Sequence, residues 1–272
     1  MAYLDDLFGV AGKTALVTGG GSGIGRMMAE ALVRAGAHVL IASRKVEACE
    51  AVAAELNGIG PGTAEGFAGD VSSGEGIAAL AADVAQRTDA LHILINNSGI
   101  SWGEPMESFP FEQWTRVMNV NAGAVFTLSR DLMPLLSAAA SDDDPARIIN
   151  IGSVMGTVPL AEGAYSYSAS KAAVHHITRI LATELAAKRI TCNAFAPGPF
   201  PSKMTRFATG SEELAAQVGA NVPLGRIGRP EDLAAATLFL CGRGGSYVSG
   251  AILPVDGGMS AMPPPNLFAN IE

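Results

Sequence analysis

Two tyrosines stand close to one lysine in the stretch AYSYSASKAAVHH, which runs from Ala164 to His176. Tyr167 lies four residues before Lys171, so on a helix the two side chains share one face. Tyr165 lies six residues before Lys171, or about 600° of helical rotation, and points to a different face. A tyrosine with a pKa of about 10 is a poor acid or base at neutral pH, and a neighbouring ammonium lowers that pKa. The spacing predicts that Tyr167 and Lys171 handle a proton, and that Tyr165 packs or lines a substrate wall.

A glycine-rich turn, TGGGSGIG, spans Thr18–Gly25 between an apolar run and an amphipathic run. Where a strand meets a helix, glycines let the backbone approach a pyrophosphate, and the helix N-terminus offers N–H donors and partial positive charge. The spacing Gly19-x-x-x-Gly23-x-Gly25 differs from the common GxGxxG, although the mechanics are the same. The turn therefore predicts a dinucleotide site that uses Gly19, Gly21, Ser22, Gly23 and Ile24.

The end of the second apolar run indicates which dinucleotide is bound. A chain that binds NAD usually ends this strand with Asp or Glu, which hydrogen-bonds the ribose 2′-hydroxyl. Here the run ends with Ser43, Arg44 and Lys45. Arg44 can pair bidentately with a 2′-phosphate, whereas an acid would repel it, so the sequence predicts NADP(H) in preference to NAD(H). Asp70 and Val71, at the end of the third run, are expected to face the adenine.

Apolar β-rich runs alternate with helical patterns along almost the whole chain. Strands are predicted at residues 13–20, 38–44, 64–71, 91–99, 147–153, 189–198 and 251–258. Helices are predicted at residues 25–37, 46–56, 76–87, about 111–136, 164–188 and 231–241. Such an alternation forms right-handed crossover units and a parallel sheet covered on both faces. We therefore expect an α/β fold in which residues 1–272 form one Rossmann domain with a doubly wound, seven-stranded parallel sheet.

Three segments interrupt this alternation. Residues 137–147 (SAAASDDDPAR) are small and acidic, which predicts a solvent-exposed loop with no chemistry. Residues 197–223 are richer in Pro, Gly and Ser than a simple connection requires. Because they follow the C-terminal end of a strand, where open α/β sheets bind ligands, we interpret them as a substrate lid. The C-terminal tail, 259–272, is expected either to be disordered or to contact another subunit.

Composition argues against several classes of protein. No segment approaches the ~18 uninterrupted apolar residues of a membrane span, and the acidic N-terminus does not resemble a signal peptide. The net charge of −8 argues against nucleic acid as a partner. Cysteines without CxxC spacing, Cys49, Cys192 and Cys241, indicate reduced thiols in a cytoplasmic protein without a zinc site. The histidines show no metal-ligand spacing, and His175 and His176 are expected on a helix surface or at a subunit contact.

Six motifs occur in an order that resembles the short-chain dehydrogenase/reductase family along essentially the entire chain. They are TGGGSGIG, NNSG at Asn96–Gly99, Asn121 in NVNAGAVF, Ser153 in IGSV, the Tyr167-x-x-x-Lys171 pair and Pro197-Gly198. One departure is Ser98, where the family usually has Ala, and it adds only a hydroxyl beside the cofactor. The resemblance implies an NAD(P)-dependent oxidoreductase, in which the nicotinamide carries the hydride.

The roles of the family's residues carry over by position. The resemblance implies that Tyr167 is the general acid in carbonyl reduction and the general base in alcohol oxidation. Lys171 would lower the pKa of that tyrosine and bind the nicotinamide ribose. Ser153 would hydrogen-bond the substrate oxygen, and Asn121 would help hold a water that connects Lys171 to solvent. Further cofactor contacts are expected from Asn97, Gly99, Pro197, Gly198, Phe200, Ser202 and Met204.

The lid sequence suggests a substrate class. PGPFPSKMTRF, together with SWG and INIGSVMG, resembles the β-ketoacyl reductases associated with rhamnolipid biosynthesis, which also carry FPS, a basic residue and MT after Pro-Gly. This resemblance implies NADPH-dependent reduction of a 3-oxoacyl thioester or a similar apolar carbonyl compound. Phe200, Met204 and Phe207 suit an apolar lid, and Lys203 and Arg206 could meet an anionic carrier. The alternative is that these residues only anchor the lid on the cofactor.

Other functions stay open at this point. Related lids occur on polyol, sugar-acid and steroid dehydrogenases. A non-catalytic dinucleotide-binding regulator is a remote alternative, because such a protein would be expected to lose Tyr167 or Lys171. The resemblance also implies a homotetramer in which the helices around Phe111–Leu136 and Ala164–Lys188 pair between subunits. The expected ligand is thus a small carbonyl or alcohol substrate, carrier- or CoA-linked if it is an acyl thioester, with no nucleic acid, membrane or metal.

Overall fold

A parallel sheet forms the centre of the molecule in the computed structural model, which describes residues 2–159 and 163–262. The strands are β1 (Thr14–Thr18), β2 (His38–Ser43), β3 (Thr63–Ala68), β4 (Ile93–Asn96), β5 (Ala146–Ile151), β6 (Ile190–Pro197) and β7 (Ile252–Val255). Their order is β3-β2-β1-β4-β5-β6-β7, and every neighbouring pair is parallel. The predicted doubly wound, seven-stranded sheet is confirmed, and each strand overlaps its predicted range.

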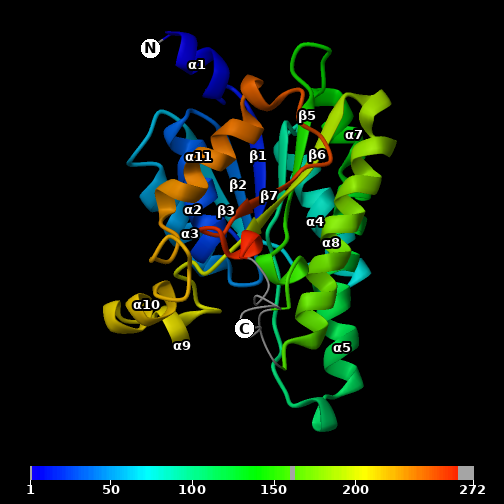
Figure 1. The fold of residues 1–272 in the computed structure, drawn as a ribbon. Coiled ribbons are helices and arrows are strands. Elements are labelled where there is room, and N and C mark those ends of the chain that lie inside the picture. Colours follow the sequence, from blue (N-terminus) through cyan, green and yellow to red (C-terminus); the bar gives the residue numbers. More distant parts are fainter. Residues whose placement is uncertain (1, 160–162, 263–272) are drawn as a thin grey trace.

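Helices cover both faces of this sheet. The α-helices are α1 (Ala2–Phe8), α2 (Gly23–Arg34), α3 (Val46–Leu56), α4 (Gly74–Arg87), α5 (Phe111–Met118), α6 (Ala124–Asp131), α7 (Met133–Ala139), α8 (Tyr165–Glu184), α9 (Arg206–Thr209), α10 (Glu212–Gly219) and α11 (Pro230–Cys241). Short 3₁₀ turns are η1 (Met106–Ser108), η3 (Val154–Gly156), η4 (Ala186–Lys188), η5 (Arg243–Gly245) and η6 (Met259–Ala261), and η2 (Asn119–Gly123) is a π-helical turn. Figure 1 shows α2, α3 and α11 on one side of the sheet and α4, α7 and α8 on the other.

The central strands are stable in this position because both of their faces are apolar. In β1, Ala15 and Val17 belong to the core on the side of α2, α3 and α11, whereas Leu16 belongs to the core on the side of α4, α6 and α8. In β5, Ile149 and Ile148 divide between the two cores in the same way. Alternate side chains of a strand point to opposite faces, so a strand covered on both sides is apolar at most positions. This requirement explains the continuous apolar runs in the sequence.

The helix predicted at about 111–136 is interrupted twice. The π-helical turn η2 follows α5, and in it the side chain of Asn121 hydrogen-bonds both the N–H (2.8 Å) and the C=O (2.9 Å) of Ile100. A second break lies at Leu132, before α7. Pro134 has no N–H to donate to the preceding turn, which removes one helical hydrogen bond and favours a break at this point. The prediction of one continuous helix was therefore wrong.

An ion-pair network closes the end of the sheet at which the strands begin. Lys13 Nζ lies 2.6 Å from one carboxylate oxygen of Asp144, and Arg147 Nη2 lies 2.8 Å from the other. Arg147 is fully buried and donates two further hydrogen bonds to backbone carbonyls at the end of α11. The prediction of a solvent-exposed loop at 137–147 was wrong at both ends of the segment. Helix α7 continues to Ala139, and Asp144 is a half-buried ion-pair partner.

The opposite end of the sheet carries the loops that follow the strands. The chain runs outward from β1 through β2 to β3, and then returns to β4 on the other side of β1. This reversal leaves a crevice at the C-terminal ends of β1 and β4, where open α/β sheets bind ligands. Helices α9 and α10 stand apart from the body at this end (Figure 1).

Helices α9 and α10 form inside the segment interpreted as a lid, where no helix was predicted. Ser211 caps α10, because its Oγ accepts a hydrogen bond from the N–H of Leu214 (3.3 Å), and Glu212 and Glu213 lie in the first turn. These ordinary helix-start signals were visible in the sequence. Most of the predicted tail, residues 263–272, lies outside the described residues. No helix of the described part is long and apolar enough to cross a membrane.

Candidate active site

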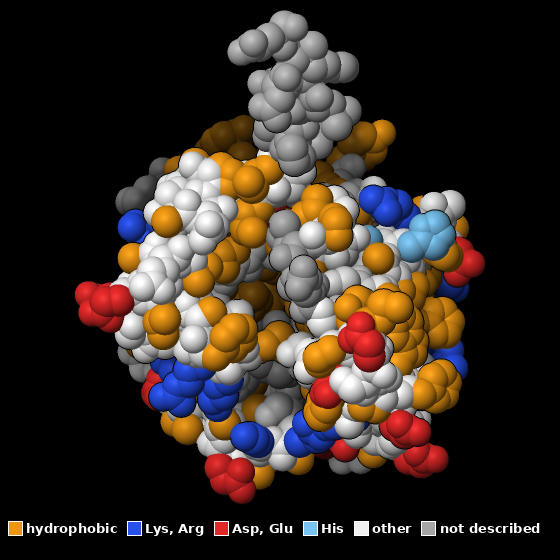
Figure 2. Space-filling model, turned by 60° about the horizontal axis from the view of Figure 1, so that its bottom comes forward, with side chains coloured by type: hydrophobic (Ala, Val, Ile, Leu, Met, Phe, Trp, Pro, Cys, Tyr) orange, Lys and Arg blue, Asp and Glu red, His pale blue; other side chains and the backbone are white. Residues whose placement is uncertain are grey.

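A cavity of about 650 Å³ opens at the C-terminal ends of the strands. Figure 2 shows this hollow with hydrophobic side chains in its depth and Lys and Arg side chains at its lower margin. Its walls come from the turn after β1, the ends of β2 to β5, α8 and the lid segment. The predicted cofactor residues all line it: Gly19, Gly21, Ser22, Gly23, Ile24, Ser43, Arg44, Lys45, Asp70, Val71, Asn97, Gly99, Tyr167, Lys171, Pro197, Gly198, Phe200, Ser202 and Met204.

Tyr167 and Lys171 border the cavity from α8. Lys171 is buried, its Nζ lies 5.5 Å from the centroid of the Tyr167 ring, and it donates a 2.7 Å hydrogen bond to the carbonyl oxygen of Ile151 at the end of β5. Tyr165 lies outside the cavity wall, 39% exposed, and its ring meets the ring of Phe109 edge-on at 5.7 Å. The structure therefore separates the two tyrosines in the way that helical spacing predicts.

Ser153 faces Tyr167 from the turn after β5. It is the N-cap of η3, where its Oγ accepts a hydrogen bond from the N–H of Met155 (3.2 Å). The hydroxyl of Ser153 lies near that of Tyr167 and acts to lower the pKa of the tyrosine. Two neighbouring hydroxyls at a cavity wall can hydrogen-bond the same ligand oxygen.

Burial dominates the electrostatics of the Tyr167–Lys171 pair. It raises the pKa of Tyr167 above its usual value, and the neighbouring Ser153 hydroxyl offsets this only in part. It also lowers the pKa of Lys171 to about 8. Burial thus outweighs the lowering expected from the Lys171 ammonium, which is bonded to the Ile151 carbonyl and not to the phenol. The phenol is the stable form at neutral pH.

Asn121 lies beside Lys171 but outside the cavity wall. It is buried, and its amide donates to Ser170 Oγ (2.9 Å) as well as to the carbonyl oxygen of Ile100. A Cβ on Gly99 would come 3.2 Å from Asn121 Oδ1 and 3.6 Å from Lys171 Nζ, so these residues meet at one point. The structure therefore places Asn121 where it fixes the loop after β4, and its water-holding role stays a prediction.

His175 is buried one helical turn beyond Lys171, which contradicts its expected place on a surface. Its Nε2 accepts a 3.5 Å hydrogen bond from the backbone N–H of Ser153. The ring fills the space beside two glycines: a Cβ on Gly152 would collide with Nε2, and a Cβ on Gly156 would come 2.9 Å from Cε1. His175 thus supports the turn that carries Ser153.

The imidazole of His175 is neutral at ordinary pH. Burial lowers its pKa to about 4, and the charges of Arg179 and Lys171 act in the same direction. Its neighbour His176 is exposed, as predicted. The sequence contains no sign of this difference, because adjacent residues of a helix differ in burial only through the helix's packing partners.

The glycine turn leaves backbone donors open to the cavity. Gly19 and Gly23 have φ angles of +68° and +55°, which residues with side chains rarely adopt. A Cβ on Gly25 would collide with the amide nitrogen of Asn97. Ser22 is the N-cap of α2, but its side chain makes no capping hydrogen bond, and the first turn has no acidic residue. The first N–H groups of α2 are therefore suited to an anion.

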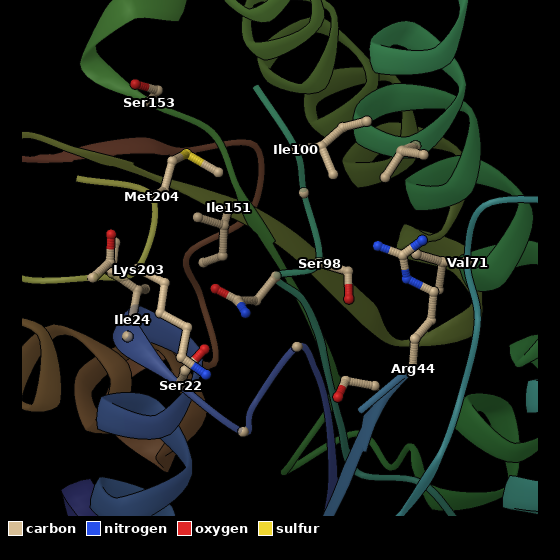
Figure 3. A pocket seen from close by; sticks show the side chains of 18 of the residues that line it. Ser22, Ile24, Arg44, Val71, Ser98, Ile100, Ile151, Ser153, Lys203 and Met204 are labelled. Carbon is tan, nitrogen blue, oxygen red and sulfur yellow. The ribbon is translucent and has the colours of Figure 1, made fainter. Parts of the chain in front are cut away.

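The ends of β2 and β3 form a basic part of the wall. In Figure 3, the side chain of Arg44 extends into the cavity and lies beside Val71. Burial acts to raise the pKa of Asp70, but a backbone hydrogen bond and the charge of Arg44 hold it below its usual value. Among residues 2–159 and 163–262, neither Arg44 nor Lys45 has an ion-pair partner. This end suits a ligand of high negative charge.

Some lining residues were not among the predicted site residues. Arg116 and Val120, one helical turn apart, line the main cavity and also a neighbouring cavity of about 440 Å³. Ile100 and Ile151 add apolar wall. Lys203, predicted to meet a carrier, lines the main cavity as well. No group of His, Cys, Asp and Glu in the described part of the chain is arranged to hold a metal ion.

The lid segment divides into a part that lines the cavity and a part that does not. Phe200 is buried, and Met204 lines the cavity with 41% of its surface exposed. Arg206 and Phe207, in α9, lie outside the wall, and Phe207 is 85% exposed. The lid therefore offers apolar surface both at the cavity and beyond it.

Comparisons with known proteins agree with this arrangement. A family model described as "Enoyl-(Acyl carrier protein) reductase" matches residues 19–260. The rhamnolipids biosynthesis 3-oxoacyl-[acyl-carrier-protein] reductase of Pseudomonas aeruginosa is 44% identical over 251 residues, which are 92% of this chain and 97% of that protein. The galactitol 2-dehydrogenase (L-tagatose-forming) of Cereibacter sphaeroides is 38% identical over 253 residues, 93% of this chain and 96% of that protein. The solved RhlG/NADP active-site complex of Pseudomonas aeruginosa is 44% identical and matches with a TM-score of 0.89, over 94% of this chain and 99% of that one.

Proposed function

The chain belongs to the short-chain dehydrogenase/reductase family, and from this premise we propose that it uses NADPH to reduce the ketone of a 3-oxoacyl thioester, or of a similar apolar compound, to a secondary alcohol. One observation carries the proposal. Ser153, Tyr167 and Lys171 come together at one end of a cavity whose other end is basic. The first end suits a reacting carbonyl, and the second suits a phosphorylated dinucleotide.

Each side chain has a place in the reduction of a carbonyl group. Bound NADPH would supply the hydride. The hydroxyls of Ser153 and Tyr167 hydrogen-bond the substrate oxygen and stabilise the negative charge that develops on it. Tyr167 then donates its proton to this oxygen, and its raised pKa keeps that proton available at neutral pH. Lys171, held beside the ring by Ile151, stabilises the phenolate that remains.

NADP(H) in preference to NAD(H) follows from the basic end of the cavity. Arg44 and Lys45 can pair with a 2′-phosphate, and β2 ends without the carboxylate that would repel it. Asp70 and Val71 form the adjoining wall, where we place the adenine. The Pseudomonas aeruginosa RhlG structure, 44% identical, is an NADP complex.

An acyl substrate is supported by the lid and by the relatives. Met204 and Phe207 present exposed apolar surface at and next to the cavity, which suits a hydrocarbon chain. The 44% identical relative is by name a reductase of a 3-oxoacyl group on acyl carrier protein. We place the acyl chain against residues 197–223, which act as the substrate lid.

A dehydrogenase of a polyol or sugar acid is the second candidate, because the 38% identical relative is a galactitol 2-dehydrogenase. A polyol needs several hydrogen-bonding partners, whereas Met204 and Phe207 offer none. A hydroxysteroid would suit the apolar lid but is not the substrate named for either relative. The acyl thioester therefore stays the first choice.

A substrate panel run with NADPH and with NADH tests this proposal. It contains an acetoacetyl thioester, longer 3-oxoacyl thioesters, a keto-sugar acid, a ketose and a ketosteroid, with Tyr167→Phe as the blank. We expect oxidation of NADPH with the thioesters, at a kcat/KM about tenfold or more above that with NADH. Turnover of the ketose or the keto-sugar acid without turnover of any thioester would contradict this proposal. It would identify the protein as a polyol or sugar-acid dehydrogenase instead.

We also propose a homotetramer in the cytoplasm. Phe126 on α6 and Ile180 on α8 are 46% and 45% exposed, on the helices expected to pair between subunits. The cysteines Cys49, Cys192 and Cys241 are free and buried, which suits a reducing compartment. Sedimentation of the purified protein measures the assembly, and substitution of Phe126 and Ile180 by Ser should shift it to smaller species.

A further inference from the structure

The first part of the lid is a turn fixed by Thr205. Its Oγ1 donates to the carbonyl oxygen of Phe200 (2.7 Å) and accepts from the backbone N–H of Ser202 (3.1 Å). The Ser202 hydroxyl in turn accepts from the backbone N–H of Thr205 (3.1 Å). Phe200 is buried, with its ring against Gly228. Lys203, inside this turn, therefore projects from a well-defined backbone position.

The turn rests on the first residue of α2. A Cβ on Gly23 would lie only 3.0 Å from Cβ of Ser202, so a side chain at Gly23 would displace the lid. Figure 3 shows the side chain of Lys203 running from the lid past Ile24 toward Ser22, the N-cap of α2. The lysine thus reaches the cavity wall at which the glycine turn presents its backbone donors.

The start of α2 beside Lys203 is positively charged, and no acidic residue in the described part of the chain pairs with Lys203 there. The N-terminus of the twelve-residue helix α2 contributes partial positive charge, and its first turn has no acidic residue. Lys203 forms no ion pair with any residue in 2–159 or 163–262. A cation placed beside unsatisfied N–H donors is the environment that a phosphate group prefers.

On the basis of the proposed dinucleotide site, we propose that Lys203 binds the pyrophosphate of the cofactor. The lysine then belongs to the cofactor site and not to a docking surface for an anionic carrier. Arg206 provides the comparison within the same lid, since both side chains are exposed but only Lys203 lines the cavity. A carrier that approaches from solvent meets Arg206 away from the cavity, whereas the exposed Lys203 borders the cavity beside the start of α2.

Titration of NADPH and NADH against three variants tests the assignment. Lys203→Gln removes the proposed pyrophosphate contact, Arg206→Gln is the matched control in the same lid, and Arg44→Gln removes the contact proposed for the 2′-phosphate. Because both dinucleotides contain the pyrophosphate, Lys203→Gln should weaken NADPH and NADH by the same factor, about tenfold. Arg44→Gln should weaken NADPH alone, and Arg206→Gln should weaken neither.

Two results would overturn the assignment of Lys203. Unchanged dissociation constants in Lys203→Gln, in a protein with the wild-type melting temperature, would remove the lysine from the cofactor site. A raised KM for an acyl-carrier thioester in that variant, with unchanged KM for NADPH, would assign it to the carrier instead. A different result would contradict the proposed function itself. In that case the wild-type protein would bind neither NADPH nor NADH.

Discussion

Lys171 Nζ donates a 2.7 Å hydrogen bond to the carbonyl oxygen of Ile151, which joins α8 to the end of β5. Ser153 follows Ile151 by two residues, and Tyr167 lies one helical turn before Lys171. This buried contact therefore helps to set the position of the helix that carries Tyr167 relative to the turn that carries Ser153.

Tyr167→Phe should lower kcat by about 100-fold or more, because it removes the proton that the substrate oxygen needs. The dissociation constant of NADPH should change by less than about twofold, since the ring is retained. Tyr165→Phe is the matched control, and it should keep the wild-type kcat because Tyr165 packs edge-on against Phe109 outside the cavity. Steady-state kinetics of both variants measure kcat, and fluorescence titration measures the dissociation constant of NADPH. Equal losses in the two variants would contradict the assignment.

The rate of carbonyl reduction should fall as the pH rises through about 8, which is where burial places the pKa of Lys171. Above that pH the ammonium loses its proton and no longer stabilises the phenolate left by Tyr167. The apparent pKa belongs to the Tyr167–Lys171 pair, because the two groups lie close enough to titrate together. A profile of kcat against pH from about 6 to about 10 checks this. A flat profile across that range would show that Lys171 does not titrate with turnover.

Arg44→Ser should weaken NADPH by about 10- to 100-fold and leave NADH nearly unchanged, because a charge-assisted pair with the 2′-phosphate is lost. Arg26→Gln is a suitable control. Arg26 lies on α2 and pairs at the surface with Glu55 at 2.6 Å, outside the cavity wall. Competition titrations of both dinucleotides give the ratio of the dissociation constants of NADPH and NADH. Parallel weakening of NADPH and NADH in Arg44→Ser would mean that Arg44 contacts a part common to both.

His175 should make the fold sensitive to acid. Its folded pKa is about 4 against 6.5 when unfolded, so the unfolded chain binds the extra proton between these values and stability falls as the pH drops from about 6.5 toward 4. The free energy of unfolding should lose up to about 2 kcal/mol between pH 7 and pH 5 from this group. His175→Leu should show a smaller difference between denaturant melts at these two pH values. An identical difference in both proteins would show that another group carries the acid sensitivity.

The fold and the grouping of Ser153, Tyr167 and Lys171 at one cavity were predictable because they depend on short-range patterns. The glycine turn involves only the residues that join one strand to one helix. Tyr167 and Lys171 are separated by only one helical turn. Each motif also stands at the C-terminal end of a strand or on the helix beside it, so the parallel sheet brings all of them to one crevice. Local periodicity and motif order therefore suffice for the architecture and for most of the cavity wall.

The parts that could not be predicted depend on contacts between segments far apart in the chain. His175 has the same helical pattern as an exposed histidine, and only its packing against Gly152 and Ser153 distinguishes it. Asp144 stands in an acidic run of ordinary loop composition, yet it pairs with Lys13. Asn121 stands in an ordinary helical pattern, yet it lies in a π-helical turn and its amide pairs with Ile100. A single sequence does not record such partners.

The two ends of the sheet should respond differently to ionic strength. One end carries the ion-pair network of Lys13, Asp144 and Arg147. The other carries cations that have no ion-pair partner among the described residues. Added salt screens charges that face solvent but has little effect on a buried pair. The Arg147 end should therefore hold its geometry as salt is raised, while Arg44, Lys45 and Lys203 lose attraction for an anionic ligand. Over a range of salt concentration in which the folded chain keeps its stability, its affinity for a dinucleotide should therefore decrease.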